Sequence, residues 1–493
     1  MKKEGSESYQ HILKYTGIFG GVQGLNIVLG LVRTKLIALL LGPSGMGLAS
    51  LFNTTVGFVS QATNLGVSFS AVRHLSALYD AGDEAALEHF VKVVRGWSLL
   101  TALLGMLVCL LIGPILSQTT FAWGNHTLHF MLLAPAVGML AITGGETAIL
   151  KAMRSLGSLA SVQVFAVVAA LVISIPIYYF FGESGIVPVI VLMALATLLL
   201  TVRHSYRLMP LHLSGAKGML GEGMEMVRLG VAFTLAAVIG SASELLIRSY
   251  LNVVGDLDML GLYNAGYMLT ITYAGMVFSA MEADYFPRLS GVQHDIVATN
   301  ECVNRQMEVS LLLLSPMLAA LMLSLPILIP LLFSSQFLPV VEMAQVATLA
   351  MYLKVMTLPV AYITLARGYS LSYLFLETSY YVAFIVLFIV GYEHWGLYGT
   401  GIAVALAHLF EYVLVNAYAY KKYGYRFSAT VSGYAIVQTG IGLWLFLVTL
   451  LAEGLLYWGT GLLLVALSLC LSLHVLRRKT HLWNALVRRF RRG

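Results

Sequence analysis

Fourteen apolar runs restrict the fold of this chain more than any other feature. Each run is close to the length of about 20 residues that an α-helix needs to cross the hydrocarbon core of a bilayer. The 493-residue chain is 59% hydrophobic and only 11% charged, with a mean hydropathy of +0.85, which is far above the range of soluble domains. Inside lipid the backbone must satisfy its own hydrogen bonds, and consecutive apolar runs do so as helices. We therefore predict an all-α polytopic membrane protein with about 14 transmembrane helices.

Basic residues divide unequally between the two sides of the predicted membrane. Cytoplasmic loops collect Lys and Arg, and an N-terminus placed inside puts 25 of the 29 basic residues in cytoplasmic segments and none in outer loops. The outer loops are short and carry acids such as Glu183 and Glu453. This pattern predicts a multi-pass protein with both termini in the cytoplasm. The basic tail from Arg477 to Arg492 favours contact with anionic lipid rather than with nucleic acid.

A weak internal repeat relates the two halves of the chain. At an offset of about 214 residues several positions coincide: Gly47-Leu48 with Gly261-Leu262, Leu75-Ser76 with Leu289-Ser290, and Ala152 with Ala366. Six predicted helices lie in each half, so we expect two six-helix lobes related by pseudo-two-fold symmetry about the membrane normal, plus two C-terminal helices.

These matches predict four regions. Residues 1–206 form an N-lobe of helices 1–6, and residues 207–225 form a cytoplasmic linker. Residues 226–426 form a C-lobe of helices 7–12, and residues 427–493 add helices 13 and 14 with the basic cytoplasmic tail.

Four cations inside apolar runs are the best candidates for function, namely Arg33, Lys35, Arg248 and Lys354. A cation at bilayer depth costs about 2.5–3.5 kcal/mol unless it faces a bundle interior or a wet cavity, which suggests an anionic ligand. Lys35 lies seven residues before Gly42, as Arg248 lies seven before Gly255. At 1.5 Å per residue, both cations sit about 10 Å from the outer ends of their helices.

Lys35 and Arg248 could hold a diphosphate, Arg through a bidentate fork and Lys as a point charge. An alternative for Arg248 is an intrahelical ion pair with Glu244, four residues earlier. The alternative for Lys35 is snorkelling to the outer headgroups. Arg33 is roughly 200° around the helix from Lys35, so the two cannot both face one narrow stripe, and we expect one of them to snorkel or to pair elsewhere.

Lys354 and Glu411 lie at comparable depth in helices 10 and 12, and His408 stands three residues before Glu411. A Lys354–Glu411 salt bridge that fixes helix packing is one interpretation. The other is a protonation site or a headgroup contact, in which His408 and Glu411 relay a proton.

Several kinds of chemistry have no matching motif. We find no nucleotide-binding loop, nucleophile elbow or metal-ligand spacing, and the three cysteines show no pairing pattern. We expect no cofactor, no metal, no disulfide and no catalytic domain, so the chain is predicted to be a transporter rather than an enzyme.

The turn Leu41-Gly42-Pro43-Ser44-Gly45-Met46-Gly47-Leu48-Ala49, followed by Phe52-Asn53, resembles the turn between helices 1 and 2 of O-antigen and enterobacterial-common-antigen translocases. These are Wzx-type flippases of the multidrug/oligosaccharidyl-lipid/polysaccharide (MOP) exporter superfamily. The position of Lys35 before the glycine is similar to the family pattern. So is the stretch from Arg248 to Gly261-Leu262-Tyr263-Asn264.

The resemblance implies a flippase of the bacterial cytoplasmic (inner) membrane that works by alternating access. Its substrate would be an undecaprenyl-diphosphate-linked oligosaccharide, moved from the cytoplasmic to the periplasmic leaflet for O-antigen, lipopolysaccharide or other surface polysaccharide biosynthesis. Membrane lipids and polysaccharide polymerase machinery are the expected partners. The alternative is a cation-coupled multidrug exporter of the same fold. Glu146 is the only acid within helices 1 to 6, which disfavours this alternative.

Overall fold

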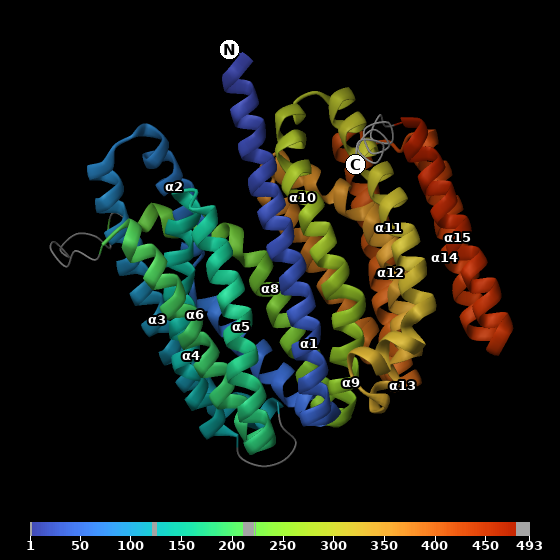
Figure 1. Cartoon of the computed structure of the whole chain (residues 1–493), viewed down its shortest axis with the longest axis horizontal. Coiled ribbons are helices and arrows are strands. Elements are labelled where there is room, and N and C mark those ends of the chain that lie inside the picture. Colours follow the sequence, from blue (N-terminus) through green and yellow to red (C-terminus); the bar gives the residue numbers. More distant parts are fainter. Residues whose placement is uncertain (1, 121–125, 211–220, 222, 480–493) are drawn as a thin grey trace. The chain divides into compact units, whose positions relative to one another are not determined.

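The computed structural model describes residues 2–120, 126–210, 221 and 223–479. This part of the chain is almost entirely α-helical and contains no strand (Figure 1). The all-α prediction is therefore confirmed. The basic tail from residue 480 onward and most of the predicted linker lie outside the described residues.

Packing divides the chain into two compact units. The first contains Met1–Gly261 with Leu332–Ser334, and the second contains Leu262–Leu331 with Ser335–Gly493. These units follow contacts, whereas the lobes at 1–206 and 226–426 follow the repeat, so the lobe boundaries stay a prediction.

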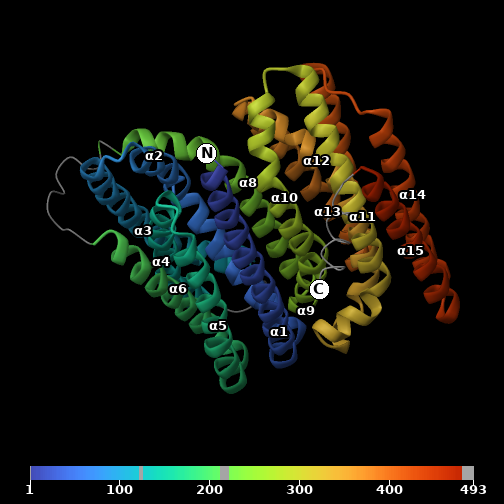
Figure 2. The same ribbon diagram turned by 45° about the horizontal axis from the view of Figure 1, so that its top comes forward.

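The first unit is built from seven α-helices and the beginning of an eighth. They are α1 (Lys2–Thr63), α2 (Val67–Ala81), α3 (Glu84–Thr120), α4 (Thr127–Ala152), α5 (Leu156–Phe181), α6 (Ile186–Leu208), α8 (Met224–Val254) and the start of α9 (Leu257–Tyr267). A 3₁₀ turn, η1 (Gly182–Gly185), joins α5 to α6. In Figures 1 and 2, α3, α4, α5 and α6 lie side by side.

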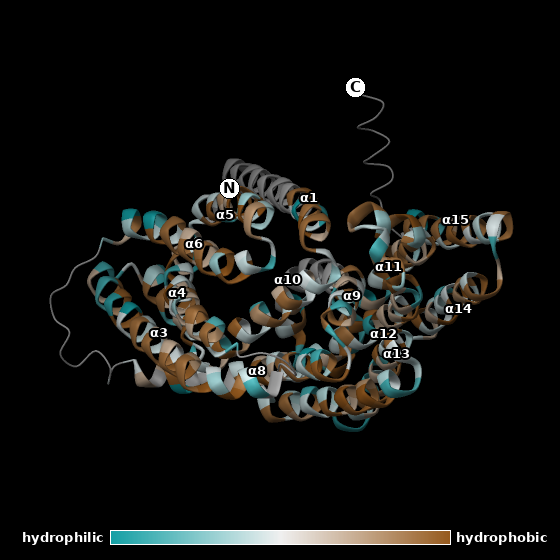
Figure 3. Cartoon of the chain, turned by 90° about the horizontal axis from the view of Figure 1, so that it is seen from below, coloured by the Kyte–Doolittle hydropathy of each residue, from teal (hydrophilic) through white to brown (hydrophobic). Residues whose placement is uncertain are grey.

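The second unit continues from the end of α9. It contains the π-turn η2 (Met268–Thr272), α10 (Tyr273–Val292), α11 (Ile296–Leu332), the 3₁₀ turn η3 (Ser335–Phe337), α12 (Val340–Ala366), α13 (Ser370–Tyr423), α14 (Ala429–Leu451) and α15 (Gly454–Lys479). The turn η3 lies in the connection between α11 and α12. The helices α14 and α15 pack against each other and are hydrophobic along their length (Figure 3).

The helical lengths account for fourteen membrane crossings. Within the described ranges, nine apolar helical runs are long enough to span a membrane. Three of them reverse direction and hold two crossings each: α1 at Gly42, α5 with α6 through η1, and α13 at Gly396. The helix α8 and the α9–α10 segment are not among these nine runs, and the predicted number of fourteen crossings requires both.

Backbone conformation supports the repeat at an offset of 214 residues. Gly182 ends α5 at φ 55° and ψ −133°, and Gly396 interrupts α13 at φ 55° and ψ −136°. This left-handed region is open to glycine at little steric cost. Arg154 and Gly368, again 214 residues apart, also share a positive φ.

The two turns that correspond in the repeat, both predicted from the sequence to lie outside, also contact each other reciprocally. A Cβ on Gly47 would lie 2.3 Å from the carbonyl oxygen of Leu257, and a Cβ on Gly261 would lie 1.9 Å from that of Pro43. Pro43 and Leu257 are themselves repeat equivalents, so each turn contacts the other through the same positions, as two-fold symmetry requires.

Each unit contains a hydrophobic cluster that packs its own helices together. In the first unit, side chains of α2, α3, α4 and α8 form a core that includes Leu75, Val94, Ile149 and Met226. In the second, Met322 and Leu323 of α11 pack with Leu445 of α14 and Tyr457 of α15. The latter cluster fixes the last two helices to the rest of their unit.

Candidate functional site

Arg33 and Lys35 lie on α1 before the bend at Gly42. The Arg33 guanidinium donates from Nε to Ser174 Oγ of α5 over 3.4 Å, and its Nη2 lies 3.2 Å from Met193 Sδ of α6. Arg33 therefore points toward the helices of its own unit. Its contacts with described residues include no carboxylate, so the positive charge is not neutralised there. Lys35 is partly buried.

Arg248 lies on α8 with its side chain only 7% exposed. Its Nη1 contacts Glu244 Oε2 at 3.1 Å, and its Nε donates to Ser50 Oγ of α1 at 3.0 Å. The intrahelical pair that the sequence offered as an alternative is thus formed. Because Glu244 remains 43% exposed while Arg248 is buried, this pair does not bury both charges equally.

Arg33, Lys35 and Arg248 are the cations that α1 and α8 place within their apolar stretches, and Glu244 is the acid that pairs with Arg248. Of the three, Arg33 contacts no carboxylate among the described residues. An anionic group that reached this region would find Coulomb attraction strengthened by the low dielectric of the surroundings.

The second unit contains a different group of charges on α12 and α13. His408 Nδ1 lies 2.8 Å from Glu411 Oε2, and the imidazole is only 1% exposed. The structure thus places His408, rather than Lys354, in direct contact with Glu411. Lys354 is close enough to both Glu377 and Glu411 to interact with them electrostatically.

Aromatic side chains complete this second group. The ring of Tyr380 stacks on the His408 imidazole with a centroid separation of 5.1 Å and an angle of 11°. The Tyr373 hydroxyl bonds Glu377. Lys354, Glu377, His408 and Glu411 will be called the α12–α13 cluster. With His408 neutral and both carboxylates ionised, it holds one positive and two negative charges and can then accept a proton or another cation.

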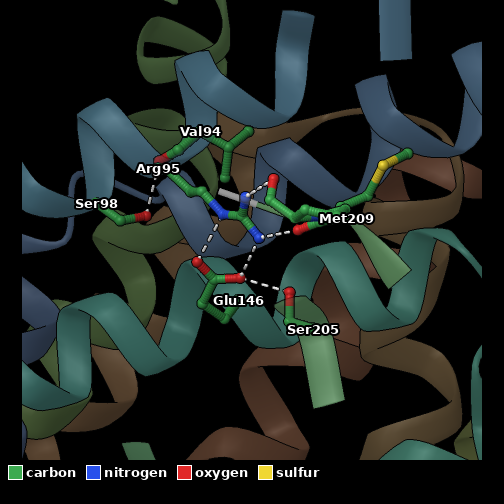
Figure 4. A network of polar contacts seen from close by, with 7 residues as sticks. Val94, Arg95, Ser98, Glu146, Ser205 and Met209 are labelled. Carbon is green, nitrogen blue, oxygen red and sulfur yellow. Dashed lines mark hydrogen bonds and ion pairs between the residues drawn. The ribbon is translucent and has the colours of Figure 1, made fainter. Parts of the chain in front are cut away.

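A third buried network lies at the predicted inner end of α3, α4 and α6 (Figure 4). The Arg95 guanidinium donates to both Glu146 oxygens, at 2.8 and 3.2 Å, and to the carbonyl of Met209 at 2.8 Å. The Ser205 hydroxyl donates to the same carboxylate, and Arg95 lies 4.4 Å above the Tyr206 ring. Glu146 is only 2% exposed and accepts three hydrogen bonds, two from Arg95 and one from Ser205.

The sequence marks Glu146 as the one acid within helices 1 to 6 but does not identify its partner. A basic residue near the inner end of α3 and a lone acid near the inner end of α4 were the available signal. The missing information was that both lie on facing helix surfaces.

Comparison with known proteins identifies the family of this chain. Residues 36–342 match the model of a family described as polysaccharide biosynthesis protein. The chain belongs to this family. The matched region covers more than half of its length. No protein of curated function matches the sequence.

Solved structures show which fold this polysaccharide biosynthesis protein has. An inward-facing multidrug resistance MATE family transporter of the MOP superfamily has a TM-score of 0.70 at 14% identity, covering 81% of this chain and 94% of its own. The lipid II flippase MurJ, in an inward closed conformation, also has a TM-score of 0.70, at 12% identity, covering 93% of this chain and 98% of its own. The chain therefore has the MOP superfamily fold and is a multi-pass membrane protein.

Proposed function

We propose that this protein is a flippase for an undecaprenyl-diphosphate-linked oligosaccharide, which it moves from the cytoplasmic to the periplasmic leaflet by alternating access. The observation that carries this proposal is the charge of Arg33 on α1, which has no carboxylate among its contacts with described residues. Arg248 on α8 is buried beside a half-exposed acid. A diphosphate would supply the missing negative charge. We place Lys35, Arg248 and Arg33 at the diphosphate, with Lys354 at a more distant part of the path.

Two further points support a lipid-linked substrate. The family is one of polysaccharide biosynthesis. The match to the flippase MurJ covers 93% of this chain, whereas the match to the MATE transporter covers 81%. We take this larger coverage to include α14 and α15. Outward movement of an anion is also favoured by an inside-negative potential at about 2.3 kcal/mol per charge per 100 mV.

The test measures polysaccharide export in cells whose only copy of the gene carries a substitution. Lys35→Ala should reduce surface polysaccharide roughly tenfold, because a charge-assisted contact to the diphosphate is lost. The lipid-linked intermediate should accumulate, while the amount of protein in the membrane stays constant. Lys35→Arg should restore most of the export, since it keeps the charge.

Arg33→Ala and Arg248→Lys extend the test to the other two cations. Lys92→Ala is the matched control, because Lys92 lies on α3 in an ordinary pair with Glu88 at 3.2 Å. Export that is unchanged in Lys35→Ala, Arg33→Ala and Arg248→Lys would contradict the proposal.

A cation-coupled drug exporter is the second candidate, and the α12–α13 cluster favours it. Glu377 and Glu411 together outnumber Lys354, as a site for a proton or a cationic drug requires. The same cells decide between the two functions. Cationic dye efflux that depends on Glu411, with normal polysaccharide export, would favour the exporter.

A further inference from the structure

A pocket of about 610 Å³ lies in the second unit, at the connection between α11 and α12 and the connection between α14 and α15. Residues of all four helices line it, and the charge distribution of the sequence predicts that these turns face outward. The polar side chains on its wall are Glu342, Gln345, Thr449, Glu453 and Tyr457, with Trp458 beside them. We call it the α12–α15 pocket.

The hydrogen bonds of Tyr457 determine which polar atom Gln345 presents to the pocket. The Tyr457 hydroxyl donates its single proton to the carbonyl oxygen of Leu323 at 3.0 Å. It can therefore only accept from Gln345, whose amide nitrogen lies 3.3 Å away. Gln345 is only 3% exposed, and its amide oxygen has no hydrogen-bond partner within the described part of the chain. An acceptor is thus left over at the pocket wall.

The other polar groups of the pocket are also acceptors. The Thr449 hydroxyl donates to the carbonyl of Phe446 at 2.8 Å, which leaves its oxygen lone pairs. Glu342 and Glu453 are exposed carboxylates that form no ion pair with the described residues. None of the pocket's lining residues is basic. Four side chains of the wall therefore offer acceptors, namely Glu342, Gln345, Thr449 and Glu453, and the two carboxylates among them are negatively charged. The Trp458 indole N–H is the one side-chain donor beside them.

A structural role explains part of this set but not all of it. Glu342 lies in the first turn of α12 and Glu453 directly precedes α15, where helix dipoles favour acids by about 0.3–1 kcal/mol each. Gln345 lies one turn further into α12, and its amide oxygen gains nothing from that dipole. Oε1 of Gln345 is not sealed from solvent, so a ligand in the pocket that donates hydrogen bonds can reach it.

The surface next to the pocket is suited to lipid. Leu451, Leu455 and Leu456 lie at the turn between α14 and α15, and they are 82%, 92% and 68% exposed. The rings of Tyr457 and Trp458 pack edge to face at 5.0 Å. Aromatic side chains of this kind gather at membrane interfaces and attract cations through their faces.

We propose that the α12–α15 pocket binds the ammonium group of an ethanolamine phospholipid headgroup. An ammonium has three donors and no acceptor, which complements a wall of acceptors with two negative charges. The acyl chains would lie along the exposed leucines, and the phosphate would stay in the aqueous headgroup layer. The same charge excludes anionic lipids and the diphosphate of the proposed substrate. The inference is independent of the proposed function.

The test measures lipid retention by native mass spectrometry of the full-length protein, exchanged into micelles that contain one lipid at a time. Phosphatidylethanolamine should be retained roughly tenfold better than phosphatidylglycerol, and Glu342→Gln with Glu453→Gln together should remove this preference. Phosphatidylcholine keeps the positive charge but has no N–H donor, so it should be retained poorly. Equal retention of phosphatidylcholine and phosphatidylethanolamine would overturn the proposal.

The matched control is Asp258→Asn, which neutralises an exposed acid in the first turn of α9, outside the pocket. It should leave the preference intact, and a loss there equal to that of the double variant would contradict a local site. Free glucosamine tests the other source of an ammonium group, an amino sugar. Displacement of the lipid by millimolar glucosamine but not by ethanolamine would also overturn the lipid assignment. Trp458→Leu provides a second variant that leaves both carboxylates in place and should weaken retention less.

Discussion

The Arg95–Glu146 network in the first unit and the α12–α13 cluster in the second place charge inside the helices in opposite ways. In the network, one guanidinium meets one carboxylate through two hydrogen bonds, and Ser205 donates to the same carboxylate. In the cluster, Lys354 interacts electrostatically with two carboxylates that it does not contact directly. His408 Nδ1 lies 2.8 Å from Glu411 Oε2. The first group is balanced and the second is one positive charge short.

This difference indicates different roles. A balanced buried pair leaves no capacity for a further ion, and it holds the end of α6 against α3 and α4. An unbalanced cluster keeps a capacity for a proton or cation. Such capacity is what a transporter needs where an ion or substrate must bind and leave. The two groups should therefore respond differently when a charge is removed.

The largest expected effect comes from breaking the balanced network. Arg95→Ala leaves Glu146 buried with its main donor gone, and removal of one partner from a buried pair costs about 3–5 kcal/mol. The Met209 and Pro210 carbonyls lose their donor as well. The purified protein should show a marked fall in the midpoint of thermal unfolding, followed by intrinsic fluorescence in detergent.

An exposed ion pair of the same unit provides the control. Arg154 and Asp80 are in contact at 2.9 Å, with side chains 67% and 52% exposed. Exposed pairs contribute about 0–1 kcal/mol, so Asp80→Asn should change the midpoint little. A similar loss in Arg95→Ala and Asp80→Asn would show that the buried network has no special structural weight.

Sequence alone predicted the fold well because bilayer helices follow simple rules. Length, hydropathy and the placement of basic residues gave fourteen crossings, and positions 214 residues apart share backbone angles, as Gly182 and Gly396 do. The reason is that a helix in lipid must satisfy its own backbone, so its existence depends on local composition and little on its neighbours.

Contacts between side chains were less accessible to sequence reasoning. The Glu244–Arg248 pair could be anticipated because its members are four residues apart on one helix. The Arg95–Glu146 pair joins residues 51 apart, and the pocket beside Gln345 depends on α14 and α15 packing on α11. Helix rotation and facing surfaces decide such contacts, and the apolar pattern of a membrane helix carries little information about rotation.

Removal of the one cation in the cluster should have an intermediate effect. Lys354→Met keeps the length of the side chain but leaves Glu377 and Glu411 without a positive neighbour in the cluster, which should cost about 1–3 kcal/mol. We expect a moderate fall in the unfolding midpoint that is smaller than the fall in Arg95→Ala. Lys354→Arg is the control that keeps the charge. An equal fall in both variants would assign the effect to packing rather than to charge.

The smallest effect should come from Glu377→Gln, and its sign separates the two groups. The amide still accepts the Tyr373 hydrogen bond, while one of two like charges near Lys354 disappears. Glu377→Gln should therefore leave the free energy of unfolding unchanged or raise it by no more than about 1 kcal/mol, because it removes a negative charge where acids are in excess. Glu146→Gln makes the same chemical change where charges are balanced, and it should destabilise because it leaves Arg95 uncompensated. Thermal unfolding of the two variants side by side measures the contrast, and a loss of equal size in both would show that the α12–α13 cluster is balanced after all.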